Sequence, residues 1–193
     1  RQDEVLAACV SLAKSFKTDK IRCFDFWRLA DPAPHRAAID EKLRDAAEIT
    51  RKNGIDLILE NEHECNTATA PEAARLLSAV PILNLNWDPA NAVMAGEHDA
   101  FPAGWKLLPK DRIHHCHCKN AVSDSQGKVV WSPVDIGFID WAAQFRALKS
   151  IGYHNAVSLE THWRGAGTPE ASSRISWAGM KKELEASGTL VAS

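Results

Sequence analysis

Four residues with metal-binding side chains each close a short apolar run of this chain: Glu60, Asp88, His117 and Glu160. They follow one another at intervals of 28, 29 and 43 positions, about one strand and one helix per step. The runs that end in them read IDLILE, ILNLNWD, IHHCH and AVSLE. In a barrel of parallel strands the carboxyl ends meet at one mouth, where barrel enzymes carry out their chemistry. The pattern therefore predicts a metal-dependent barrel enzyme.

Three carboxylates that meet in a partly dry pocket repel one another. At a separation of about 5 Å and an effective dielectric constant of about 20, each ionised pair costs about 3 kcal/mol. A divalent cation between them removes this repulsion. Three oxygen donors and one imidazole suit Mn²⁺, Mg²⁺ or Co²⁺ at least as well as Zn²⁺, and we expect Mn²⁺. Taken singly, each residue has an ordinary explanation as an exposed acid or a core histidine, but four at successive strand ends favour a metal.

The elements that must position these residues alternate along the chain. Apolar runs predict strands over residues 21–26, 55–60, 81–88, 113–117 and 156–160. Apolar periodicity and capping signals predict helices over 2–16, 35–52 and 139–151, with a short helix from Pro71 and a final one from Thr168-Pro169. The polar stretches 89–112 and 120–137 read as loops, the second with a small ribbon at 128–131. Alternating strands and helices predict a parallel sheet with right-handed crossovers.

The number of strands indicates part of a barrel. A (β/α)8 TIM barrel has eight strands and typically about 250 residues, whereas five strand-helix units are predicted in these 193 residues. We therefore expect one domain over residues 1–193, a TIM-barrel type whose N-terminal units lie before this sequence. Two alternatives stay open: an open five-stranded sheet that is complete in itself, or a half-barrel closed by a second copy, which makes a homo-oligomer.

Side-chain alternation indicates which residues enter the barrel. Along 82–88 it places Asn84, Asn86 and Asp88 inside and Leu83, Leu85 and Trp87 outside. Along 113–119 it places His115, His117 and Lys119 inside and His114, Cys116 and Cys118 outside. The string HCHC is therefore not expected to bind zinc, because only alternate residues reach one point and no second cluster completes a tetrahedron. We expect Cys116 and Cys118 to be small buried apolar residues.

Composition is that of an ordinary soluble domain, with 45% hydrophobic and 25% charged residues. A net charge of −2 without a run of Lys or Arg disfavours nucleic acid as a partner, and no apolar run suggests a membrane span. The five cysteines are an odd number without the spacing of a disulfide framework. We expect reduced thiols and a cytoplasmic protein.

Five segments carry a resemblance to a known family: LILENEH, LNWDPAN, HHCHCKN, GFIDW and VSLETHWR. Together they resemble the sugar phosphate isomerase/epimerase group of the xylose isomerase-like barrels, over nearly the whole chain. The resemblance implies a small sugar or sugar phosphate as substrate and the four residues above as metal ligands. It also implies that Glu60 and Glu160 move a proton on the carbon next to a carbonyl, through an enediolate, to give an epimer or an aldose–ketose isomer.

Further residues are candidates for binding the substrate. His63 and Lys119 are placed to hold substrate hydroxyls. Asn91 stands where several relatives have a histidine, three residues after the aspartate, and Asn120 stands where an aspartate often follows the lysine. Both departures concern the choice of substrate.

Two kinds of residue could contact the rest of a sugar. Trp27, Trp131 and Trp163 lie beyond strand ends or in the long loop, where an indole could stack on a sugar face, whereas Trp141 and Trp177 lie in helical patterns and are expected in the core. Arg164, with Gly165, Gly167 and the start of the final helix, could receive a phosphate. The plain alternative is a glycine-rich connection with an exposed arginine.

Two other functions are weighed against the isomerase. Barrel endonucleases that cut at abasic DNA sites share this ancestry, but they need more histidines, including one at the position of Asn91, and this chain is not basic. A non-catalytic relic that binds a sugar or a partner is the other alternative. The presence of all four metal-binding residues argues against the relic.

Overall fold

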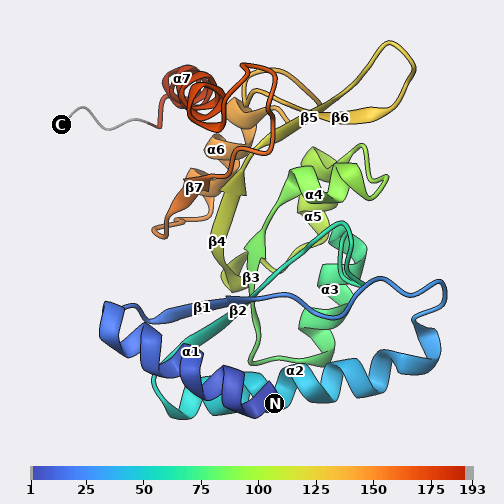
Figure 1. The fold of residues 1–193 in the computed structure, drawn as a ribbon, viewed down its shortest axis with the longest axis vertical. Coiled ribbons are helices and arrows are strands. Elements are labelled where there is room, and N and C mark those ends of the chain that lie inside the picture. Colours follow the sequence, from blue (N-terminus) through green and yellow to red (C-terminus); the bar gives the residue numbers. More distant parts are fainter. Residues whose placement is uncertain (1, 190–193) are drawn as a thin grey trace.

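The computed structural model describes residues 2–189. Five parallel strands pair in the order β1-β2-β3-β4-β7, so the order in the sheet follows the chain. Their bounds are β1 Lys20–Cys23, β2 Asp56–Glu60, β3 Asn84–Trp87, β4 Ile113–Cys118 and β7 Val157–Leu159. The sheet turns from β1, which runs across the view of Figure 1, to β4, which runs upward. The architecture is a five-stranded parallel half-barrel, and the predicted fold class is confirmed.

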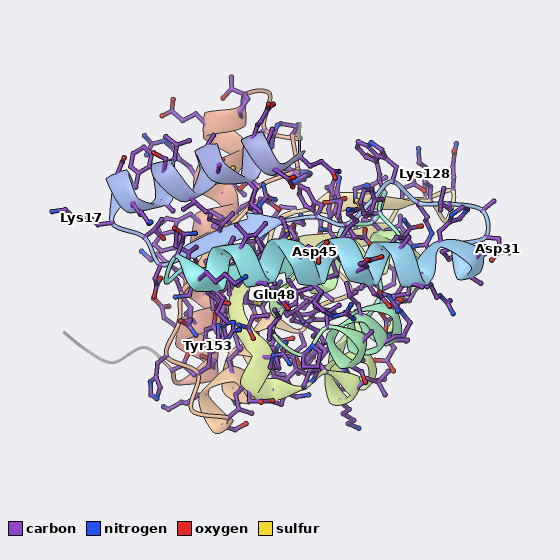
Figure 2. The ribbon with its side chains drawn as sticks, turned by 90° about the horizontal axis from the view of Figure 1, so that it is seen from below. Lys17, Asp31, Asp45, Glu48, Lys128 and Tyr153 are labelled. Carbon is purple, nitrogen blue, oxygen red and sulfur yellow. The ribbon has the colours of Figure 1, made fainter. Side chains whose placement is uncertain are left out.

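Helices precede, connect and follow the strands. The longer ones are α1 Gln2–Phe16, α2 Arg36–Lys52, α3 Ala70–Ala79, α6 Trp141–Ser150 and α7 Pro169–Ser187. Figure 2 shows α1 and α2 side by side, with Asp45 and Glu48 labelled on α2. All five helices lie where the sequence predicts them, because their signals are local. Thr168, for example, caps α7 with a side-chain oxygen that accepts a hydrogen bond from the backbone N–H of Ala171 at 3.1 Å.

The two stretches predicted as loops contain more regular structure than expected. The range 89–112 holds α4 Pro89–Met94, α5 Trp105–Leu107 and the short turns η2 Ala100–Gly104 and η3 Lys110–Arg112; a similar turn, η1 Ala33–His35, precedes α2. The range 120–137 holds an antiparallel hairpin of β5 Asn120–Ser123 and β6 Val129–Ser132. Its turn is closed by Asp124, whose carboxylate accepts hydrogen bonds from the N–H groups of Gln126 and Lys128, both at 2.9 Å.

The apolar face of the sheet packs against the helices, as the alternation predicts. Its side chains are all buried in one core: Leu57, Leu59, Leu83, Leu85, Trp87, Cys116 and Cys118. Trp141 is also fully buried. The expectation for Trp177 is wrong, because its side chain is 49% exposed. Helix α7 buries a face of small residues and one methionine instead: Ser172, Ser176, Gly179 and Met180.

The prediction that His114 points out of the barrel is also wrong. The pairing of β3 with β4 shifts between Leu85 and Asn86, so His114 is an extra residue between two paired positions. Its imidazole pairs with the carboxylate of Asp56 on β2. Beyond this bulge the alternation is restored, and the imidazole Nε2 of His115 lies 2.9 Å from the hydroxyl of Ser158 on β7.

Two simpler expectations can be compared with the structure. All five cysteines are free, and Cys116 and Cys118 are fully buried. Within residues 2–189, no helix has both the length and the apolar character needed to cross a membrane.

Candidate metal centre

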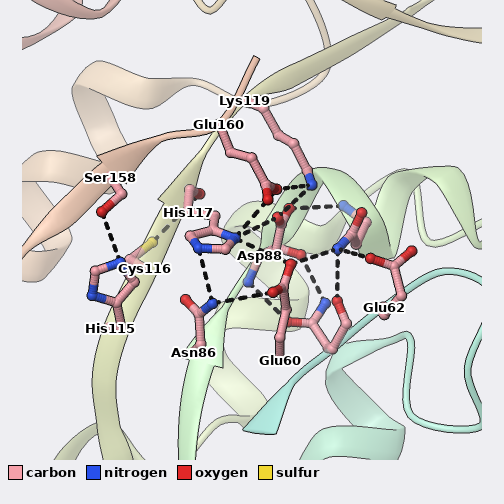
Figure 3. Close-up of polar contacts among 12 residues, drawn as sticks. Glu60, Glu62, Asn86, Asp88, His115, Cys116, His117, Lys119, Ser158 and Glu160 are labelled. Atoms are coloured by element: carbon pink, nitrogen blue, oxygen red, sulfur yellow. Dashed lines mark hydrogen bonds and ion pairs between the residues drawn. The ribbon is translucent and has the colours of Figure 1, made fainter. Parts of the chain in front are cut away.

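The four residues at the strand ends meet in one place. One ligand atom from each of Glu60, Asp88, His117 and Glu160 lies within 4.8 Å of the corresponding atoms of the others. Figure 3 shows the four side chains pointing toward one another at the mouth of the half-barrel. The Glu60 side chain is 1% exposed and that of Glu160 is 33% exposed. The group therefore has a buried side, formed by β2 and β3, and an open side at β7.

Asp88 is held by the start of α4. Its Oδ1 accepts a hydrogen bond from the N–H of Asn91 at 2.9 Å and so caps the helix. The side chain of Asn61 bonds both backbone groups of Asp88, donating to its carbonyl at 2.7 Å and accepting from its N–H at 2.8 Å. These bonds join the ends of β2 and β3. They leave the buried Oδ2 of Asp88 directed into the site.

Glu60 is fixed from three sides. The guanidinium of Arg22 on β1 lies 2.6 Å from its Oε2, and the amide of Asn86 on β3 donates to the same oxygen at 3.4 Å. The amide of Asn91 donates to Oε1 at 3.2 Å. The same amide also reaches Glu62, at 3.1 Å. Glu60 therefore has one orientation, with Oε1 facing His117 at 3.1 Å.

His117 lies between the carboxylates. Its Nδ1 is 3.1 Å from Glu60, 3.3 Å from Glu160 and 3.6 Å from Asp88, while its Nε2 lies 3.1 Å from the amide nitrogen of Asn86. Burial disfavours the charged imidazole, but hydrogen bonds to the three carboxylates outweigh it and raise the pKa of His117 to about 11. Burial acts to raise the pKa of Asp88 and of Glu160, but His117 and Lys119 lower both, and His162 also lowers that of Glu160.

Lys119 supplies a fixed positive charge. Its ammonium lies 2.9 Å from Oδ2 of Asp88 and 2.5 Å from Oε2 of Glu160, and the side chain is buried. Burial alone would lower the pKa of Lys119. The two carboxylates raise it by more than burial lowers it, so the pKa lies above its ordinary value and the ammonium is charged. The sequence predicts repulsion among the three carboxylates, and protonated His117 and Lys119 offset it.

The residues present fit a divalent cation. Two ligands on opposite sides of one Mg²⁺ ion are about 4.0–4.2 Å apart, so four atoms that lie within 4.8 Å of one another need only a modest contraction to share an ion. The buried Oδ2 of Asp88 accepts no well-aligned hydrogen bond from the described residues, although the Lys119 ammonium is near it. A buried carboxylate oxygen whose capacity to accept hydrogen bonds is not filled is what a cation would use.

The predicted substrate residues fall into two groups. The first group, His63, Asn91 and Lys119, lies around the four candidate ligands. Lys119 pairs with Asp88, and Asn91 donates a hydrogen bond to Glu60. His63 pairs with Glu62, which Asn91 also contacts. Trp27 and Arg164 do not hydrogen-bond with them. The side chain of Trp27 is 73% exposed, and Arg164 donates to the backbone oxygens of Thr161 and Trp163 in its own loop.

A sequence model of the family described as xylose isomerase-like TIM barrel matches residues 4–183. The chain belongs to that family. The resemblance read from the five segments is confirmed at this level. No curated protein matches the chain significantly in sequence.

Solved structures of the xylose isomerase-like TIM barrels share the fold. A family member from Mycobacterium smegmatis, in complex with magnesium, superposes with a TM-score of 0.70 at 20% identity, over 96% of this chain and 68% of that one. The probable 3-DHS dehydratase AsbF from Bacillus anthracis gives 0.71 at 23% identity, over 92% and 68%. A D-psicose 3-epimerase from Clostridium cellulolyticum H10, with D-tagatose, gives 0.70 at 16% identity, over 96% and 71%. At these identities the likeness concerns the fold.

Several residues around the xylose isomerase-like site escaped the sequence analysis. Alternation places Asn86 inside the barrel, and the same count along β1 would have placed Arg22 there. Asn61 and Glu62 carry no signal beyond their position directly after Glu60. His162 lies on the loop after β7. Trp131, which the sequence indicates as an indole that could stack on a sugar, lies on β6, and its ring contact with His162, with centroids 4.8 Å apart, depends on tertiary structure.

Proposed function

We propose that this chain is a divalent-metal-dependent isomerase or epimerase of a small sugar or sugar phosphate. The observation that carries the proposal is the convergence of two glutamates, one aspartate and one histidine from four strand ends. The family includes sugar epimerases, and the magnesium complex of one structural neighbour supports a cation. We expect Mn²⁺, with Mg²⁺, Co²⁺ and Zn²⁺ as alternatives.

Glu60, Asp88, His117 and Glu160 would hold the ion. When bound, the ion supplies a Lewis acid for the carbonyl of the substrate. His117 must then present a neutral imidazole, so its proton has to leave its Nδ1. Nε2 then keeps its proton, so the Asn86 amide beside it must turn its oxygen toward Nε2 to accept that proton and hold the ring.

Glu60 and Glu160 would transfer the proton. One carboxylate takes the proton from the carbon next to the carbonyl, and a proton returned to the other face of that carbon gives an epimer. A proton returned to the neighbouring carbon gives the aldose–ketose isomer. Glu60 is held by Arg22, Asn86 and Asn91, which suits a base that must keep one position.

The surrounding polar side chains would orient the substrate. Lys119 and Asn91 present donors next to the carboxylates, and His63 lies on the loop after β2. Trp27 and Arg164 stay predictions for contacts with more distant parts of the sugar.

The test is exchange of a carbon-bound proton with solvent. The chain is incubated in D₂O with Mn²⁺ and D-psicose, D-tagatose, L-ribulose or the corresponding phosphates, and deuterium in the sugar is measured by NMR. We expect exchange with the wild type and at least about a hundredfold loss with Glu160→Gln. Glu170→Gln, a change on the exposed surface of α7, is the matched control and should leave exchange unaltered.

Two results would contradict the proposal. Exchange that persists in Glu160→Gln would remove this glutamate from the proton transfer. Absence of exchange for every sugar, in a protein that melts cooperatively, would favour a binding protein that has lost its catalysis.

A further inference from the structure

The hairpin β5–β6 brings a tryptophan to the proposed site. It begins at Asn120, directly after Lys119, and extends above α4 in Figure 1. Trp131 on β6 lies opposite Ala121 on β5. The Lys119 ammonium, which pairs with Asp88 and Glu160, is 5.1 Å from the centroid of the Trp131 ring. The indole is therefore adjacent to the charged groups of the site.

Two imidazoles flank this indole. His63, from the loop after β2, meets it edge-on with ring centroids 5.8 Å apart. His162, from the loop after β7, lies at 4.8 Å with the planes tilted by 49°. The Nε2 of His162 is also 3.5 Å from Oε2 of Glu160. Three rings from separate segments of the chain thus border the open side of the four-residue group.

Packing alone does not account for this arrangement. Trp141, a structural tryptophan, is fully buried and donates its indole N–H to the carbonyl of Lys119 at 2.9 Å. Trp131 packs partly against the core and is only partly buried, and its indole N–H donates no hydrogen bond to another of the residues 2–189. Its ring neighbours are an ammonium and two imidazoles.

We propose that Trp131, flanked by His63 and His162, is a wall of the substrate site on which a ketose lies. The negative face of an indole attracts the weakly positive C–H groups of one sugar face. The flanking imidazoles and the free indole N–H are polar groups that can bond the hydroxyls at the edge of the sugar. This inference rests on the proposed function for the class of substrate.

The wall gives Trp131 a positioning role. It lies beside the carboxylates but carries no group that moves a proton, so its loss should weaken binding of the sugar and leave the chemical step nearly unchanged. For an exchanging ketose, Trp131→Ala should raise KM and alter kcat little. A purely structural role would instead lower the melting temperature and affect both constants together.

The experiment measures binding of D-tagatose to the full chain with Mn²⁺ present. Trp131→Ala should weaken binding by about tenfold and Trp131→Phe, which keeps a ring, by no more than about threefold. Trp177→Ala on α7 is the control, because it removes an indole that is 49% exposed and lies outside the proposed site. The sugar-induced change in tryptophan emission should be equal in the wild type and in Trp177→Ala and much smaller in Trp131→Phe. Melting curves verify that each variant is folded.

Three outcomes would overturn the wall: equal affinity of folded Trp131→Ala and wild type, an emission change as large in Trp131→Phe as in the wild type, or no saturable binding of D-tagatose by the wild type. Failure of the proposed function looks different. Saturable binding that depends on Trp131, without deuterium exchange, would support the wall and contradict the isomerase.

Discussion

At the scale of single residues, the site combines three carboxylates with cations that belong to the chain itself. Lys119 is the most buried of these cations and contacts Asp88 and Glu160 together. Buried ion pairs contribute little net stability when both partners are present, but removing one partner leaves an uncompensated charge. Lys119 is therefore the residue at which the electrostatics of the site can be tested without any substrate.

We expect Lys119→Met to lower the free energy of unfolding of the metal-free protein by about 3 kcal/mol, because two carboxylates lose their counter-charge. Mn²⁺ should restore part of this loss. Urea unfolding measures both effects. Lys182→Met is the control, since Lys182 pairs with Asp135 at a similar distance, 3.0 Å, but on the exposed surface, and should change stability little. An equal loss in the two variants would mean that burial of Lys119 is unimportant.

At the scale of elements, caps decide where the connecting helices begin. Thr69 and Glu72 form a capping box at the start of α3. The carboxylate of Glu72 accepts hydrogen bonds from the N–H groups of Ala68 and Thr69, at 2.9 and 3.0 Å, and pairs with Arg28. Burial acts against ionisation, but these bonds hold the pKa of Glu72 below its ordinary value of 4.5. Because α3 connects β2 to β3, this cap helps to align two of the strands that carry the site.

A lowered pKa in the folded state means that the ionised carboxylate stabilises the protein above the unfolded value, and that this contribution is lost as pH falls through the folded value. Glu72→Gln should therefore lower the free energy of unfolding by about 1 kcal/mol at pH 7. The difference from wild type should shrink as the pH is lowered below 4.5. Urea unfolding across this pH range checks it, with Glu170→Gln as an exposed control in the first turn of α7. A difference that grows toward acid pH would contradict the assignment.

The elements also explain which features could be predicted from sequence. The convergence of Glu60 and Glu160 follows from their place at strand ends, which local apolar runs reveal. His114 could not be placed, because a bulge depends on how two strands pair and leaves no local signal. Trp177 was misplaced because the buried face of α7 is made of small residues, which a search for large apolar side chains overlooks.

At the scale of the whole molecule, the four candidate ligands tie together strands that are distant in sequence. One candidate ligand lies at or directly after the carboxyl end of each of β2, β3, β4 and β7, and β1 and β7 form the two open edges of the sheet. The chain covers about two thirds of the length of its structural neighbours, 68% for two of them. An ion at the mouth would link the strand ends across most of the half-barrel.

We expect Mn²⁺ to raise the melting temperature, because a ligand that binds only the folded chain stabilises it by about 2.7 kcal/mol at one hundred times its dissociation constant. Glu160→Gln should show a much smaller shift, since one of the four ligands is altered. Differential scanning calorimetry with and without the ion measures this. A cooperative melt that is indifferent to Mn²⁺ in the wild type would argue against a metal centre.

The Lys119 ammonium bears on whether folding or metal binding comes first. This charge belongs to the chain itself, so Asp88 and Glu160 have a counter-charge as soon as the strands that carry them come together. Folding can then come first and metal uptake second. A folded molecule would then take up the proposed cation at a site that is already assembled, and it would lose and regain the ion without unfolding.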